Sequence, residues 1–343
     1  MKRLRTVSII LAIAVLALTW VAAIAQDEAT EEPEMEMTEE EALIAHGEYI
    51  AYISGCISCH TPPQEEYRDL TALTLDQAIT MSIAAEDTLD IENAAYSGGR
   101  IFDLGPAGII FTANITPDEE TGIGSWTDEE IETAIRIGVN PDGRRLFPLM
   151  PYRNYFNMAE DDMQALIAFL RSLEPVENEV PRIGPTGEGI APELIAEDDA
   201  LLEAPVAADD PVARGEYLVN TIMSCGDCHT PIDPTTGEPI FDQWLAGGQP
   251  WEGPWGIVYG GNITPHEETG IGTWTDEEIA IAIRAGIRPD GRRLILMPWQ
   301  DYIVLTDEDT ESIVAYLRDI PAVDLEAPAP SIGEPFLVFE DAD

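Results

Sequence analysis

The chain has 343 residues, of which 45% are hydrophobic, so it is long and apolar enough for about two domains with packed cores. It carries 17 basic and 65 acidic residues, and its formal net charge is −48. A field of that sign repels phosphates, which argues against nucleic acid and anionic lipid surfaces as partners and favours basic or neutral ones. The alternative explanation of the negative charge is a well-solvated surface suited to high salt, with no specific partner.

Residues 1–25 have the pattern of a targeting segment. Basic residues within the first five positions precede an uncharged apolar run at 7–25, which ends in Ala23-Ile24-Ala25, a small-residue cleavage pattern. The run is long for a signal peptide and just long enough to span a bilayer, which takes about 17–25 residues. The sequence predicts either a cleaved signal or an N-terminal membrane anchor, and both place the rest of the chain in the periplasm or at the cell surface. Residues 26–39 are acidic and expected to be disordered.

Two five-residue stretches contain all the cysteines of the chain. They are Cys56-Ile57-Ser58-Cys59-His60 and Cys225-Gly226-Asp227-Cys228-His229, and both have the spacing C-x-x-C-H. In this spacing two thiols add to the vinyl groups of one porphyrin, and the adjacent imidazole lies under the iron as its proximal ligand. The sequence therefore predicts two covalently bound haem c groups. The predicted attachment residues are Cys56, Cys59, Cys225 and Cys228, and the predicted proximal iron ligands are His60 and His229.

Two other kinds of site use a C-x-x-C pair. A thioredoxin-like disulfide does not need a histidine directly after both pairs. One zinc ion bound by all four thiolates would leave both histidines unexplained. Export also agrees with haem c, because this group is attached on the outer side of the membrane.

The two motifs belong to two copies of one domain. The segment 114–146 aligns without gaps with 262–294, and most aligned positions are identical. Such a repeat indicates a duplicated unit. The predicted boundaries are 40–176 for the first copy, 177–207 for a linker rich in proline, glycine and acid, 208–323 for the second copy and 324–343 for a tail. The first copy has an insertion at about 70–93 without a chemical motif.

Each copy is predicted to be helical. Apolar residues recur at helical spacing over 43–53, and Thr127 to Glu130 form a capping box that Thr275 to Glu278 repeat. The last helices are expected at about 159–173 and 307–320, and Pro-Asp-Gly turns at 141–143 and 289–291 are expected to end the capped helices. Because alternating β-branched residues are few, we expect an all-α fold.

The second axial position of each iron needs a ligand, and thioether sulfur is the usual one in electron-transfer cytochromes. Met150 aligns with Met297, whereas Met158 and Met163 align with other residue types and Met81 falls in the insertion. The second copy has no other methionine after its motif. Met150 and Met297 are therefore the predicted axial ligands, against the alternative that they fill gaps in the core.

Three further features have less specific interpretations. His46 and His266 have no histidine at the aligned positions and are expected on the surface. The Arg-Arg pairs at 144–145 and 292–293 either neutralise haem propionates or pair with surface acids. The Asn-Ile-Thr sequences at 114–116 and 262–264 match a glycosylation sequon but, because they recur inside the repeat, are expected to form a structural loop.

Taken together, the motifs resemble class I c-type cytochrome domains. They are Gly-Glu-Tyr before Cys-x-x-Cys-His-Thr, then Asn-Ile-Thr-Pro, Glu-Thr-Gly-Ile-Gly, Trp-Thr-Asp-Glu-Glu, Pro-Asp-Gly-Arg and Met-Pro-Tyr. The chain is similar to the cytochrome c subunit of membrane-bound periplasmic dehydrogenases that oxidise alcohols, aldehydes or gluconate. Those subunits usually carry three haem domains, whereas this chain has two. The resemblance implies two tandem class I domains whose first and last helices cross, with close approaches at Gly47 and Gly215, and the ligand pairs His60 with Met150 and His229 with Met297.

The function expected is that of a dihaem c-type cytochrome rather than of an enzyme by itself. It would transfer single electrons between an exported or membrane-bound donor, such as a dehydrogenase, and a respiratory acceptor, such as an oxidase. A dihaem peroxidase-like enzyme would instead require that one copy lack a sixth ligand. A docking subunit for a soluble basic carrier would bind that carrier in a salt-dependent manner.

Overall fold

The computed structural model describes residues 37–64, 88–103, 109–181, 209–253, 256–294 and 296–332. The predicted targeting segment, most of the insertion and of the linker, and the end of the tail lie outside the described residues. The chain divides into the units Met1–Glu39 and Glu40–Asp343, and the fold below is that of the second unit. None of the described helices combines the length and the apolar character that a membrane span requires.

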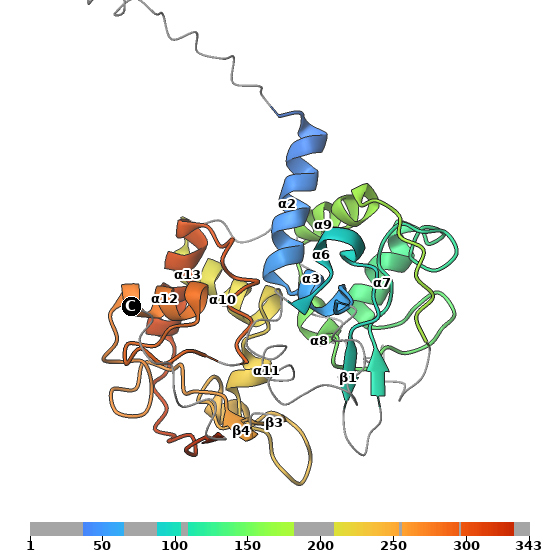
Figure 1. The fold of residues 1–343 in the computed structure, drawn as a ribbon. Helices are drawn as coiled ribbons and strands as arrows, with labels where there is room; N and C mark the ends of the chain where they lie inside the picture. Colours follow the sequence, from blue (N-terminus) through green and yellow to red (C-terminus); the bar gives the residue numbers. More distant parts are fainter. Residues whose placement is uncertain are drawn as a thin grey trace, which may run out of the picture. The chain divides into compact units, whose positions relative to one another are not determined.

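Helices dominate the described part of the chain (Figure 1). Those of the first copy are α2 (Glu39–Ile53), α3 (Cys56–His60), α6 (Ile91–Ala94), α7 (Asp128–Ile137), α8 (Tyr152–Tyr155) and α9 (Glu160–Ser172). Those of the second copy are α10 (Pro211–Tyr217), which continues as a π-helix over Leu218–Ile222, then α11 (Gly226–His229), α12 (Asp276–Ala285) and α13 (Asp307–Asp319), with a 3-10 turn at Phe241–Gln243. The predicted helices are confirmed, and the first begins earlier than predicted, at Glu39.

Two small antiparallel sheets correct the all-α expectation to a mostly helical fold. Strand β1 (Ile101–Asp103) pairs with β2 (Ile109–Phe111), and Phe102 lies opposite Ile110. Strand β4 (Gly256–Tyr259) pairs with β3 (Pro250–Gly253) on one side and with β5 (Ser331–Ile332), from the predicted tail, on the other. Strands of two to four residues are too short to show the alternation by which a strand is recognised in a sequence.

Helices α7 and α12 begin with the predicted capping boxes. The Glu130 backbone N–H donates to Thr127 Oγ1 over 3.2 Å, and the Thr127 N–H donates to Glu130 Oε2 over 2.8 Å. The same two bonds join Thr275 and Glu278 at the start of α12. They satisfy backbone donors that a helix N-terminus otherwise leaves without partners.

The ends of these helices differ from the prediction. Both end at a glycine in the left-handed region, Gly138 with φ +70° and Gly286 with φ +65°, which glycine adopts without steric cost. The Pro-Asp-Gly turns lie beyond these caps, where they close short loops whose arms meet in the bridges Val139–Arg145 and Ile287–Arg293.

The first and last helices of each copy cross at a glycine, as the resemblance implies. A Cβ built on Gly47 of α2 would overlap the carbonyl oxygen of Ala165 in α9, and one built on Gly215 of α10 would overlap that of Ser312 in α13. Backbone contact this close requires a residue without a side chain. Met158 and Met163, which the repeat does not predict to be ligands, are fully buried in the hydrophobic core.

Two tyrosines form hydrogen bonds that join the two copies. Tyr49 of α2 donates its hydroxyl to Asp309 Oδ2 of α13 over 2.6 Å, and Tyr217 of α10 donates to Asp162 Oδ2 of α9 over 2.6 Å. Tyr49 and Tyr217 occupy aligned positions of the repeat, as do Asp162 and Asp309. The two bonds are therefore reciprocal, and each joins the first helix of one copy to the last helix of the other.

His46 takes part in this junction, a contact that the sequence did not predict. Its Nε2 lies 2.6 Å from Oδ1 of the fully buried Asp162. At the aligned position of the second copy, Arg214 pairs with Asp309 through Nε over 2.7 Å. One half of the junction thus carries a permanent cation, and the other half carries an imidazole that titrates near neutral pH.

We expect the free energy of unfolding to fall as the pH rises from about 6 to 8 because of His46. The bond to Asp162 raises the pKa of His46, with an opposing effect of burial, and nearby Arg214 lowers it while Asp309 raises it. A raised folded-state pKa gives stability that is present below the unfolded pKa and is lost as the pH rises through the folded pKa. Since the side chain is 39% exposed, we expect the loss to stay below about 1 kcal/mol.

Urea unfolding at several pH values measures this loss. The matched control is His46→Arg, which copies Arg214 and keeps its charge throughout the range. The control should show a smaller pH dependence than the unchanged chain. Equal slopes for the two proteins would contradict the assignment to His46.

Candidate functional site

A cavity of about 3360 Å³ extends through the described residues and is lined by both C-x-x-C-H motifs. Pockets for small ligands usually measure about 300–1,000 Å³, so this cavity has room for more than one large group. Its lining includes every predicted attachment and ligand residue, namely Cys56, Cys59, His60, Met150, Cys225, Cys228, His229 and Met297. The structure brings together in one cavity residues that the sequence places far apart.

The histidines of the two motifs are held in the same way. His60 Nδ1 lies 2.8 Å from the Ala113 carbonyl oxygen, and His229 Nδ1 lies 2.8 Å from the Gly261 carbonyl oxygen. Because a carbonyl oxygen only accepts, Nδ1 carries the proton and the lone pair of Nε2 is left for a metal. Burial lowers the pKa of both histidines, although the bonds to the carbonyls raise it. A neutral imidazole is the form that ligates a metal.

The four thiols have a raised pKa, so they are protonated at neutral pH, although three of them are half-buried and Cys228 is exposed. None of them, all within the described residues, is part of a disulfide. Burial raises the pKa of Cys56 and of Cys225 to about 12, whereas reactive redox cysteines have a lowered pKa. Nor does any group of three or more His, Cys, Asp or Glu side chains converge as a metal site within the described ranges. The geometry of the disulfide and zinc alternatives is thus not found in this part of the chain.

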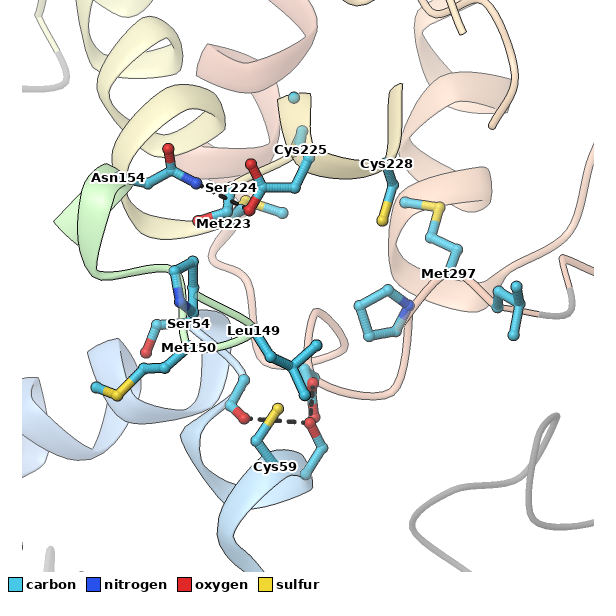
Figure 2. A pocket seen from close by; sticks show the side chains of 18 of the residues that line it. Ser54, Cys59, Leu149, Met150, Asn154, Met223, Ser224, Cys225, Cys228 and Met297 are labelled. Carbon is cyan, nitrogen blue, oxygen red and sulfur yellow. Dashed lines mark hydrogen bonds between the residues drawn. The ribbon is translucent and has the colours of Figure 1, made fainter. Parts of the chain in front are cut away.

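The two candidate methionines lie on loops that are anchored by an aromatic ring. The ring of Tyr152, two residues after Met150, lies against Gly138, where a Cβ would come within 2.6 Å of the ring. Trp299, two residues after Met297, covers Gly286 in the same way. The C-cap glycine of α7 or α12 therefore positions each methionine loop. Figure 2 shows Met297 and Cys228 directed into the same part of the cavity.

The Asn-Ile-Thr-Pro loops are structural, as expected. Buried Asn114 accepts from the Thr116 backbone N–H over 3.0 Å and donates to the Val176 carbonyl over 2.7 Å. Asn262 makes the same bonds with Thr264 and Val323. Each loop directly follows the residue whose carbonyl holds the motif histidine, a role that sequence reasoning missed. The near-identity of the loops in the two copies was the available signal.

His266 is partly exposed and also has a structural role that the sequence did not predict. Its Nδ1 accepts from the Thr269 backbone N–H over 3.1 Å, and this bond closes a turn. Asp118 closes the equivalent turn of the first copy by accepting from the Thr121 N–H over 2.7 Å. The two side chains are alternative acceptors at one position of the repeat.

The Arg-Arg pairs have one member that pairs with an acid, and three of their arginines line the cavity, where the propionate interpretation stays a prediction. Arg292 Nη2 pairs with Asp290 over 2.7 Å, and it also lines the cavity together with Arg144 and Arg293. Arg100, which sequence reasoning missed, donates through Nη1 to the Ser58 carbonyl inside the first motif and lines the cavity as well.

These residues fit covalently attached haem. Each motif supplies two thiols and a histidine whose Nε2 is available, and each copy supplies its candidate methionine on the cavity wall, which in the second copy also carries Met223. The walls between them are aliphatic, with Ile131, Ile135, Leu166 and Leu170 in the first copy and Ile279, Ile283, Ile313 and Leu317 in the second. A nitrogen and sulfur donor set in apolar surroundings is typical of cytochrome c haem sites.

Comparison with known proteins agrees with this site. No protein-family model matches the chain. It is 30% identical over 338 residues to the cytochrome c subunit of a quinone-dependent alcohol dehydrogenase from Gluconobacter oxydans, which is 91% of this chain and 59% of that subunit. It is 30% identical to the fructose dehydrogenase cytochrome subunit of Gluconobacter japonicus, over 81% of this chain and 53% of that protein. The chain is homologous to these cytochrome c subunits.

Another relative is closer in length to this chain. The diheme cytochrome c-type protein of Cereibacter sphaeroides is 29% identical over 292 residues, which cover 82% of this chain and 86% of that protein. The chain spans little more than half the length of the alcohol and fructose dehydrogenase subunits.

Proposed function

We propose that this chain is a dihaem c-type cytochrome that transfers single electrons. The observation that carries this proposal is the shared cavity, whose wall holds both pairs of thiols, both histidines and both candidate methionines. When bound, each haem supplies an iron that takes up or releases one electron. The protein holds the two groups, shields them with aliphatic side chains and offers each a thioether, which raises the reduction potential. With Met150 and Met297 as sixth ligands, neither site is open to a substrate.

The proposed architecture is two tandem class I cytochrome c domains at 40–176 and 208–323. It is supported by the paired elements α7 and α12 and by the glycine crossings of α2 with α9 and of α10 with α13. The first domain extends a little beyond 176, because Asn178 donates to the Ser97 carbonyl over 2.8 Å.

The electron donor is proposed to be a dehydrogenase, and the acceptor a respiratory component such as an oxidase. The relatives described above are cytochrome subunits of alcohol and fructose dehydrogenases, which supports a dehydrogenase as the donor. The site of action is proposed to be the periplasm or the cell surface, with attachment to the membrane through residues 1–25 if they are retained. The basic and apolar pattern of those residues supports this location.

Haem quantification on the full chain, produced in a host that matures c-type cytochromes, tests the proposal. We expect two covalently bound haems per chain and two one-electron steps in a redox titration. Replacing both cysteines of the second motif, Cys225→Ser and Cys228→Ser, should leave one covalent haem, because the first motif is complete in itself. A chain that carries no covalent haem, or a double variant that still carries two, would contradict the proposal.

A further inference from the structure

Two hydrogen bonds cross between the copies directly beside the haem motifs. Ser58 Oγ donates to Asp301 Oδ2 over 2.7 Å, and Asn154 Nδ2 donates to Asp227 Oδ2 over 3.0 Å. Figure 2 shows Asn154 beside the second motif, close to Cys225. We call Ser58–Asp301 and Asn154–Asp227 the crossed pairs.

The crossed pairs occupy aligned positions of the repeat. Ser58 and Asp227 are each the residue before the second cysteine of a C-x-x-C-H motif. Asn154 and Asp301 each follow the candidate axial methionine by four positions. Each bond therefore joins the histidine side of one haem site to the methionine side of the other.

Donor and acceptor are reversed between the two pairs. In the first pair the carboxylate comes from the methionine loop and the donor from the motif, and in the second pair the reverse holds. Each pair thus contains one carboxylate and one neutral donor. An aspartate at position 58, as in the second motif, would face Asp301 and bring two carboxylates together, which is unfavourable at such a distance. The two copies differ at these positions in a complementary way.

Asp301 lies against the first motif in a buried place. The residue is 1% exposed, and its Oδ2 would lie 3.3 Å from a Cβ built on Gly55, which precedes Cys56. The carboxylate therefore lies directly beside the first haem-attachment motif, although it belongs to the second copy.

We propose that the crossed pairs are positioning residues that hold the two haem-binding loops against each other, and that Asp301 lowers the reduction potential of the haem at the first motif. The inference rests on the proposed function. A negative charge stabilises the ferric state over the ferrous state, and the interaction is strong where water is excluded. The two haem sites would then be linked by the crossed pairs, in which a side chain of one site bonds a side chain of the other.

Asp301→Asn tests the electrostatic part, since an amide oxygen can still accept from Ser58 but carries no charge. Redox titration should show a higher potential for one haem, by about 59 mV, which is a tenfold shift of its one-electron equilibrium. The haem at the second motif, identified by its response to Met297→Leu, should keep its potential. The matched control is Asp319→Asn, the same chemical change at an exposed position at the end of α13, which should shift neither potential.

A charge swap tests the positioning part. Ser58→Asp alone should lower the urea midpoint, because it places two carboxylates together. The double variant Ser58→Asp with Asp301→Asn recreates the polarity of the second pair, and it should recover the midpoint and return the first potential toward its original value.

The outcomes separate the inference from the proposed function. Unchanged potentials in Asp301→Asn would overturn the electrostatic role, and a double variant no better than Ser58→Asp would overturn the positioning role. The haem count of the unchanged chain tests the proposed function independently, because it does not depend on either variant.

Discussion

A Met297→Leu variant is expected to lose half of the near-infrared absorption that methionine-ligated ferric haem shows, while it still binds two haems per chain. Leucine keeps the apolar volume, and such swaps usually cost less than about 1.5 kcal/mol, so the change removes the sulfur and little else. Because thioether ligation raises the reduction potential, the second haem should also become harder to reduce. Absorption spectra and a redox titration of the purified protein measure both effects.

Two other methionine variants serve as controls. Met223 also lines the cavity and lies just before the second motif, so Met223→Leu presents the same chemical change beside the same site without removing the proposed ligand. It should keep the full band, and Met150→Leu should remove the half that belongs to the first haem. A band that survives Met297→Leu and disappears in Met223→Leu would show that the ligand was assigned wrongly.

Gly47→Ala is expected to destabilise the protein by about 3 kcal/mol, at the upper end of the usual range for overpacking. The added methyl group would overlap the Ala165 carbonyl oxygen and come within 2.7 Å of Phe169 Cβ, so α2 and α9 would have to separate. The gain in helix propensity from glycine to alanine, about 1 kcal/mol, offsets only part of this loss. Urea unfolding measures the difference.

The matched control for this variant is Glu48→Ala, at the next and exposed position of the same helix. A surface change of this kind should stay within about 0.5 kcal/mol. Gly215→Ala should repeat the large loss, because the same overlap occurs with Ser312. A loss below about 1 kcal/mol for Gly47→Ala would contradict the close crossing of the helices.

The parts of the site that could be predicted from the sequence depend on short spacing or on the repeat. The motif residues Cys56 to His60 are contiguous, and the capping box at Thr127 spans one helical turn. Met150 is distant from its motif, but the alignment with Met297 selected it from several methionines. These features need no knowledge of how the helices pack.

Other features could not be predicted because they join residues that are distant in sequence. His46 pairs with Asp162 across 116 positions, and Ser58 bonds Asp301 across 243. No spacing rule connects such positions, and at least one partner of each pair differs between the two copies, so the repeat does not reveal the pairing. The short strands were missed for a different reason, since too few residues form each one to show a period.

By itself, the sequence of this protein predicted which residues hold two haem groups, because local spacing places thiols, imidazole and the cap of each helix. The tertiary structure decided how the two sites are related, because only helix packing brings Tyr49 to Asp309 and Ser58 to Asp301. Each buried carboxylate needs a donor within hydrogen-bond distance. In this chain Asp162, Asp301 and Asp309 each accept a hydrogen bond from a side chain of the other copy, and only packing brings that donor to them.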